Sequence, residues 1–224
     1  FLTAVSGGLP GMFAPGWKFH LHLMGKSALV ASSWICVYYA MRELPVSITS
    51  PIRASAPIWT LVGAILLYNE IPTLWQGAAM LLIFCGYYVF SVIGKLEGIH
   101  FVRSKGIWLI MAGTLIGSVC ALYDKYLLGV LEYDRKALQF WFSAYLILIL
   151  GLAWLIRTCF GHKHQFVWRW SIPVTGIILI IADWLYFYAL STPDVPISVL
   201  SLVRRSNCIV TFILGGLWFH DKNL

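Results

Sequence analysis

The sequence predicts an all-α, polytopic membrane protein with an inverted-topology repeat, and three observations lead to this fold class. Hydrophobic residues make up 60% of the 224 positions and charged residues only 11%, whereas about a quarter of a soluble domain is charged. The apolar residues gather in stretches of about 20, the length that an α-helix needs to cross a bilayer. One stretch also recurs later in the chain, so we expect two related halves.

Seven apolar stretches are long enough to span a membrane, and polar connections separate them. We place the spans at residues 25–41, 46–68, 73–94, 106–123, 137–156, 171–190 and 196–219. Longer polar loops are expected at 95–105, 124–136 and 157–170. Glycine and proline break up residues 1–24, so no span is assigned there.

The repeat relates residues 45–70 to 196–221, an offset of 196 − 45 = 151. Eight of the 26 aligned positions are identical: Pro45, Ser47, Ser50, Arg53, Ser55, Ile58, Thr60 and Leu66 meet Pro196, Ser198, Ser201, Arg204, Ser206, Ile209, Thr211 and Leu217. The copies begin the second and the seventh span, so they run in opposite directions. We therefore expect a first half-repeat at 1–94, a loop at 95–105 and a second half-repeat at 106–224, with a site near the bilayer midplane.

The repeat carries an arginine into the membrane twice. Arg53 and Arg204 each follow the proline of their copy by eight residues, or about 12 Å along a helix. Because the copies enter from opposite sides, both guanidinium groups are expected near the middle of a core about 30 Å thick. Two guanidinium groups at one depth favour a site for an anionic group, although snorkelling to a headgroup is the structural alternative.

Further polar and aromatic residues are candidates for the same site. Arg205 follows Arg204 directly, and Asn207 and Thr211 share a helix face with Arg204. Trp34 is the aromatic residue that we select to line the cavity, although aromatics within spans more often serve packing. These residues complete the predicted substrate-binding set.

Asp183 is the only acid that we place well inside a span. It lies about 10 Å from the turn that precedes Pro196, and so at a depth similar to that of Arg204. A neutralising ion pair with Arg204 is the structural interpretation, and proton coupling or contact with a substrate amine is the functional one.

Other patterns in the spans point to packing. Pro51 and Pro57 each remove a helical hydrogen bond, which predicts a kink or local unwinding in the second span. Gly113 and Gly117 form a Gly-x-x-x-Gly pair that predicts close helix packing. The histidine pairs, at positions 20 and 22 and at 162 and 164, lack further ligands, so we expect no metal site. No cofactor is expected either.

The stretches LPVSITSPIRASAPIWTLVGAILLYNEIPTLWQG from Leu44 and VPISVLSLVRRSNCIVTFILGGLWFHD from Val195 resemble the drug/metabolite transporter (DMT) superfamily, specifically its EamA-type family. The resemblance implies ten spans in two five-helix halves, so the chain is expected to be truncated at both ends. The small multidrug branch of the superfamily binds cations with an acid in its first helix. The equivalent span here has no acid before Asp124 at its end, which argues against a cationic drug as the substrate.

The predicted function is therefore secondary transport of a small organic metabolite, preferably anionic or zwitterionic, by alternating access. The alternatives are a seven-span receptor or sensor, and an exporter of neutral or cationic metabolites such as amino acids or drugs. An enzyme is not expected, because the sequence shows no His/Asp/Glu cluster, no Ser/His/Asp arrangement and no glycine-rich phosphate loop. The expected partners are a small-molecule substrate and the lipid bilayer, and nucleic acid is not expected. Homodimer formation is left as an alternative. The expected location is the cell (inner) membrane, with multiple passes.

Overall fold

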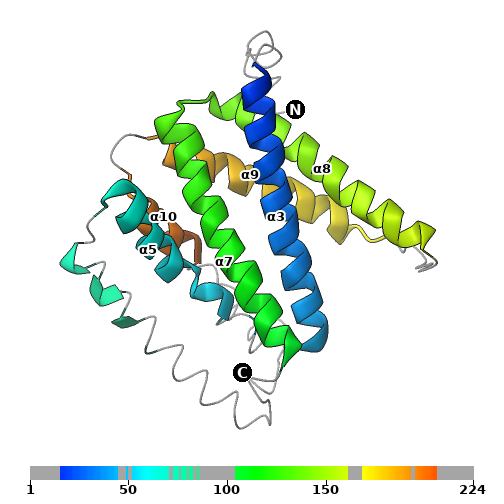
Figure 1. Ribbon diagram of the computed structural model, residues 1–224, viewed down its shortest axis with the longest axis horizontal. Helices are drawn as coiled ribbons and strands as arrows, with labels where there is room; N and C mark the ends of the chain where they lie inside the picture. Colours follow the sequence, from blue (N-terminus) through cyan, green and yellow to red (C-terminus); the bar gives the residue numbers. More distant parts are fainter. Residues whose placement is uncertain are drawn as a thin grey trace. The chain divides into compact units, whose positions relative to one another are not determined.

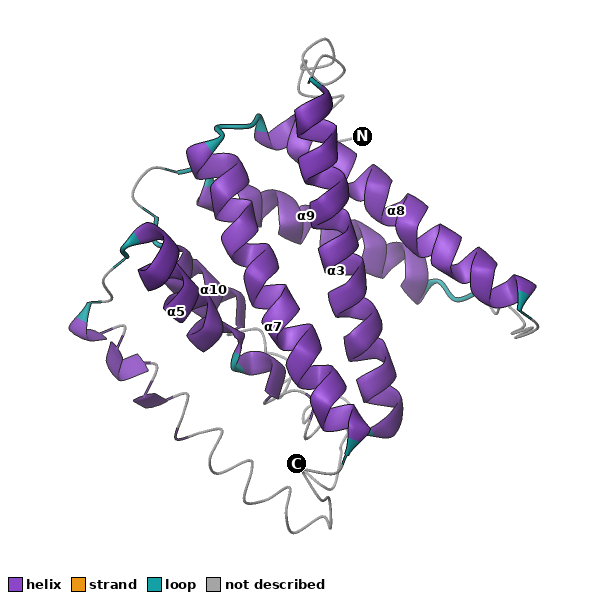
Figure 2. Ribbon diagram, viewed as in Figure 1, coloured by secondary structure: helices purple, strands orange, loops and turns teal. Residues whose placement is uncertain are grey.

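The computed structural model describes residues 16–44, 49, 52–70, 73–75, 77–79, 81–82, 85, 104–160, 168–192 and 195–205. Within these ranges the chain forms helices and short connections, without strands (Figure 2). The all-α prediction is thereby confirmed.

Within the described ranges, six α-helices and one π-helical segment have assigned bounds (Figure 1). They are α3 (Trp17–Glu43), α5 (Ala56–Tyr68), α7 (Lys105–Lys125), the π-helix η1 (Tyr126–Val130), α8 (Arg135–Cys159), α9 (Ser171–Leu190) and α10 (Ile197–Arg205). Three stretches are both long and apolar enough to cross a membrane: Lys105–Val130, Arg135–Cys159 and Ser171–Leu190. The 27 residues of α3 extend about 40 Å at 1.5 Å per residue, which also exceeds a hydrocarbon core.

Two sequence-based boundaries differ from the structure. Helix α3 begins at Trp17 rather than at residue 25. The loop predicted at 124–136 is wrong, because the helix continues through η1 to Val130 and leaves only residues 131–134 as a connection. Leu127 and Leu128 are buried, so the apolar face of the helix extends beyond the charged residues that had suggested its end.

The chain divides into two compact units, each built from separate parts of the sequence. The first unit comprises Phe1–Ala31 and Tyr123–Asp194, and the second comprises Ser32–Leu122 and Val195–Leu224. Helices α3 and α7 therefore supply residues to both units. The units do not coincide with the predicted half-repeats, which remain a prediction.

In the first unit, contacts with α8 fix the helices around it. Gln139 of α8 donates from Nε2 to the carbonyl oxygen of Ile180 on α9 at 2.9 Å. Ser27 of α3 donates from Oγ to the carbonyl oxygen of Phe142 at 3.2 Å. Both polar side chains are buried, so each hydrogen bond offsets the cost of removing a polar group from water.

In the second unit, α3 and α7 approach closely at Gly113. A Cβ atom at this glycine would lie 2.9 Å from Cγ2 of Val37 and 3.1 Å from the carbonyl oxygen of Ser33. Ser33 also donates from Oγ to the carbonyl oxygen of Gly113 at 2.7 Å. The close packing predicted from the glycine pair is thus confirmed.

The second predicted span is interrupted at Ser55. Residues 52–54 are helical, Ser55 forms a turn, and α5 starts at Ala56. Pro57 lies in the first turn of α5, where its missing N–H group has no helical partner to lose. The predicted local unwinding is confirmed at this proline, whereas Pro51 lies outside the described residues.

Candidate functional site

The interruption at Ser55 places Arg53 at a break between two helical pieces. Arg53 is half-buried and lies in the short helical turn that ends at Ala54. The Ser55 hydroxyl donates to the carbonyl oxygen of Ile52 at 2.7 Å. Since α5 starts three residues after Arg53, the positive end of its helix dipole lies beside this cationic side chain.

Helix α10 brings the second arginine to the same part of the second unit. Helix α10 packs against α5 (Figure 1), and Arg204, in its last turn, is exposed. The charges of Arg53 and Arg204 are close enough to act on each other. The two copies of the repeat therefore meet, and they bring together two cations far apart in the sequence. Binding of a substrate by these arginines remains a prediction.

The other predicted substrate-binding residues are only partly located. Arg205 ends α10, but its side chain lies outside the description, as do Asn207 and Thr211 in full. Trp34 lies on α3 in the second unit and is 37% exposed. Its role in lining a cavity therefore stays a prediction.

Asp183 is half-buried on α9. It belongs to the first unit, whereas Arg204 belongs to the second. The pairing of these two residues, and the part of Asp183 in proton coupling, stay predictions.

A buried ion pair in the first unit is the feature that the sequence reasoning missed. Nζ of Lys26 on α3 lies 2.7 Å from Oδ1 of Asp124 on α7, and the side chains are 1% and 8% exposed. Asp124 is six residues from the end of the candidate span Lys105–Val130. The expectation that Asp183 is the only acid well inside a span is therefore wrong.

Aromatic rings complete the surroundings of the Lys26 ammonium group. Its Nζ atom lies 4.3 Å from the ring centroid of Phe142 on α8 and 4.2 Å from that of Phe187 on α9. Both distances are within the range of cation–π attraction. Four helices thus contribute to one charged centre, in which a carboxylate and two π-faces replace the water around an ammonium group.

A signal for this pair was present in the sequence. The run Tyr126–Val130 reads YLLGV, which is as apolar as the span before it. Read as a continuation of the helix, this run places Asp124 and Lys125 inside the span. Lys26 has no comparable signal in the sequence. It lies at the start of the first predicted span, directly after a more polar stretch, where a lysine is ordinary.

Two histidines of α3 make hydrogen bonds with tyrosines. Nδ1 of His20 lies 2.9 Å from the Tyr145 hydroxyl, and Nδ1 of His22 lies 3.1 Å from the Tyr133 hydroxyl. The His20 ring also packs edge-on against Trp141. These contacts join the start of α3 to α8 and to the connection before α8.

Comparison with known families supports the resemblance drawn from the repeat. Residues 8–92 match the model of the EamA-like transporter family. No curated protein matches the chain. The family match confirms the predicted resemblance and, together with the long apolar helices, supports a multi-pass membrane transporter.

Proposed function

We propose that this chain, an EamA-like transporter by the match over residues 8–92, is a secondary transporter for a small anionic or zwitterionic metabolite. The observation that carries the proposal is that the charge of Arg204 acts on Arg53, near which α10 packs against α5. The substrate would present a carboxylate or phosphate group to these two guanidinium groups.

The guanidinium groups of Arg53 and Arg204 repel each other. Holding like charges close together costs free energy, and an anion between them converts the repulsion into attraction. A guanidinium group offers paired N–H donors that match the two oxygens of a carboxylate or phosphate. An anionic group is therefore the ligand class that this arrangement favours.

The helix break at Ser55 supports a transport cycle rather than static binding. A discontinuous helix in the middle of a membrane protein often marks the substrate site, and alternating access moves one repeat against the other around such a site. Arg53 precedes the break by two residues, so a change of angle at Ser55 would move its guanidinium group relative to α5.

The experiment that tests the proposal is counterflow in proteoliposomes. Inorganic phosphate, glutamate, glucose 6-phosphate, a neutral amino acid and tetraethylammonium are offered in turn to vesicles preloaded with the same unlabelled solute. Selective exchange of anions is expected. Exchange of neutral or cationic solutes only would contradict the anion site and would assign binding to Asp183 and the aromatic residues.

Arg204→Ala is the variant that links this activity to the site. Loss of a charge-assisted contact worth about 1.5–3 kcal/mol predicts anion exchange about 10- to 100-fold weaker at limiting substrate. Arg169→Ala is the matched control, since Arg169 is an exposed arginine outside the helices. Exchange at the wild-type rate in Arg204→Ala would rule out the arginine site.

A further inference from the structure

The Lys26–Asp124 pair has no part in the proposed anion site, yet its two side chains are only 1% and 8% exposed. A buried ion pair is a poor device for stability, because the cost of removing two ions from water often exceeds their attraction. Hydrophobic residues of similar size would pack four helices together at lower cost. Ionisable groups inside membrane proteins instead mark ion and proton pathways.

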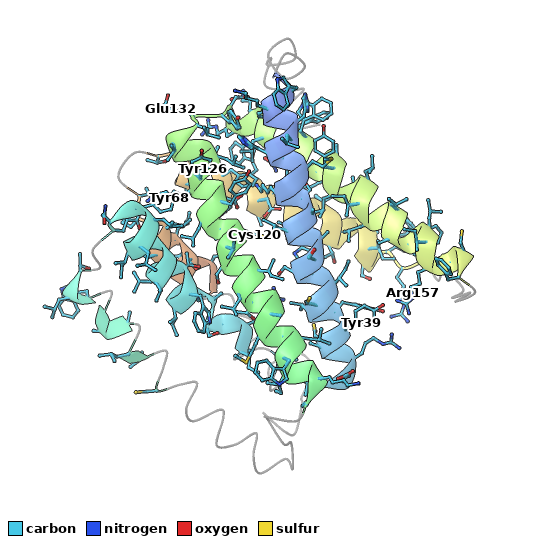
Figure 3. The ribbon with its side chains drawn as sticks, viewed as in Figure 1. Tyr39, Tyr68, Cys120, Tyr126, Glu132 and Arg157 are labelled. Carbon is cyan, nitrogen blue, oxygen red and sulfur yellow. The ribbon has the colours of Figure 1, made fainter. Side chains whose placement is uncertain are left out.

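Hydrogen bonds connect the helix of Asp124 to the helix break beside Arg53. Ser118 of α7 donates from Oγ to the carbonyl oxygen of Ala56 at 3.1 Å. Tyr68, labelled on α5 in Figure 3, donates from its hydroxyl to the carbonyl oxygen of Leu122 at 2.8 Å. The latter carbonyl precedes Asp124 by two residues, so a shift of α7 caused at Asp124 would be felt at both ends of α5.

The backbone after Asp124 departs from the α-helix. The π-helix η1 begins at Tyr126, and the N–H group of Leu131 donates to the carbonyl oxygen of Tyr126 at 3.0 Å. Short π-helical turns inside α-helices frequently occur at functional sites. The π-helix thus begins two residues after the acid.

A histidine on the same helix as Lys26 is hydrogen-bonded to the connection between η1 and α8. His22 lies one helical turn before Lys26 on α3, and its ring is hydrogen-bonded to Tyr133 in that connection. Both His22 and Tyr133 are half-buried. A titratable imidazole therefore stands between the partly accessible connection and the buried pair.

We propose that the Lys26–Asp124 pair is the proton-binding site of the transport cycle, with the Asp124 carboxylate as the group that takes up the proton. The step is a simple protonation: the carboxylate and one proton form a carboxylic acid, and Lys26 stays an ammonium group between Phe142 and Phe187. The charge of the pair thereby changes from zero to plus one. This inference rests on the proposed function, because a proton bound at Asp124 can drive transport only if the chain also moves a substrate, here in cotransport of proton and anion.

Several other ionisable groups lie on the four helices that supply the pair, and their charges contribute to its pH dependence. They are His22 on α3, Tyr123 and Lys125 on α7, Arg135 on α8, and Asp183 and Tyr186 on α9. Arg135 is engaged with the Tyr188 ring and the Ser191 hydroxyl. Asp183 is the competing carboxyl group, so the experiment must report on each acid separately.

Labelling with dicyclohexylcarbodiimide provides that separation and needs no substrate. The reagent attacks protonated carboxyl groups in apolar surroundings, and peptide mass spectrometry assigns the product to Asp124 or Asp183. Wild-type protein in proteoliposomes is expected to be labelled at Asp124, as the N-acylurea or as an amide cross-link to Lys26. Labelling should fall on the order of tenfold per pH unit above the titration midpoint. Absence of labelling at Asp124 at every pH, or labelling that does not depend on pH, would overturn the proposal.

A transport measurement then separates coupling from structural support. Asp124→Asn imitates the protonated acid, so counterflow of phosphate, glutamate or glucose 6-phosphate should persist, while uphill uptake driven by an inward proton gradient should disappear. Asp124→Glu, which keeps a carboxyl group, should retain gradient-driven uptake. Equal loss of counterflow and gradient-driven uptake in Asp124→Asn, together with unchanged labelling of wild-type protein across pH, would reduce the pair to a structural role.

The outcomes distinguish failure of this inference from failure of the proposed function. Wild-type protein that shows no anion counterflow contradicts the proposed function, while labelling of Asp124 still decides the proton site. Wild-type protein that shows anion counterflow but no response to a proton gradient leaves the proposed function intact and overturns the coupling.

Discussion

The two units arrange their charged side chains in opposite ways. In the first unit a cation and an anion lie 2.7 Å apart, and two aromatic rings cover the cation. In the second unit two cations, Arg53 and Arg204, lie near each other where copies of the repeat meet. The first arrangement is neutral as it stands, whereas the second carries a net positive charge that an anionic ligand can reduce.

We therefore expect the Lys26–Asp124 pair to affect folding, and Arg53 and Arg204 to affect substrate binding. A neutralised pair can be essential to folding, because removing one partner leaves the other charge buried. Two neighbouring like charges repel, so removing one of them relieves the folded state and weakens only the binding of an anion. Stability and transport are therefore expected to respond to different residues.

The largest effect expected from this comparison is on the stability of Asp124→Ala. The variant leaves the Lys26 ammonium group without its carboxylate, which should lower the free energy of unfolding by about 3–5 kcal/mol. Arg204→Ala should change it by no more than about 0.5 kcal/mol, because Arg204 is exposed. Thermal unfolding in detergent, followed by tryptophan fluorescence, measures both.

The double variant Lys26→Met/Asp124→Leu is the control for Asp124→Ala. It removes both charges and fills the site with apolar groups, so it should recover most of the lost stability. A double variant as unstable as Asp124→Ala would show that the attraction between the charges, rather than the exposure of a lone charge to apolar surroundings, stabilises the first unit.

The sequence predicts the arginine region better than the ion pair for a physical reason. The repeat itself predicts that Arg53 and Arg204 occupy equivalent positions, because each follows a matching proline at the same spacing. No such relation connects Lys26 with Asp124, which are brought together only by the packing of α3 on α7. The local sequence around a charged residue does not tell whether the residue lies inside a span or at its end. Only its partner in the folded protein distinguishes the two cases.

Local rules succeeded where the cause was local. Proline at position 57 predicted the break in the second span, and the glycine at position 113 predicted close packing. The end of α7 was missed, because Asp124 and Lys125 resemble the start of a polar loop. Buried apolar residues in η1 continue the helix, and the pairing of Asp124 removes the penalty that would otherwise have ended it.

Helix packing in the second unit can be disturbed without changing any charged residue. Gly113→Val would force methyl groups against Val37 and the Ser33 carbonyl oxygen, and it should lower the free energy of unfolding by about 1–3 kcal/mol. The matched control is Gly151→Ala on α8, where an added Cβ meets no atom within 4 Å. The same unfolding experiment measures both variants.

The result for Gly113→Val bears on where the second unit obtains its stability. A loss of about 1–3 kcal/mol in the free energy of unfolding would show that the close packing of α3 on α7 stabilises the second unit. A change as small as that of Gly151→Ala would mean that the two helices separate at little cost, and the expected insensitivity of stability to Arg204 would then need another source.

Tyr68→Phe is expected to lower stability less than Asp124→Ala does, and it tests the hydrogen bond between α5 and α7. The variant removes only the hydroxyl that donates to the Leu122 carbonyl oxygen, which should cost about 1 kcal/mol. Because this hydrogen bond ties α5 to α7 two residues before Asp124, we expect gradient-driven uptake to fall more than counterflow does. Tyr38→Phe is the control, since Tyr38 is 56% exposed on α3. An equal fall of both activities would show that this hydrogen bond supports the fold alone.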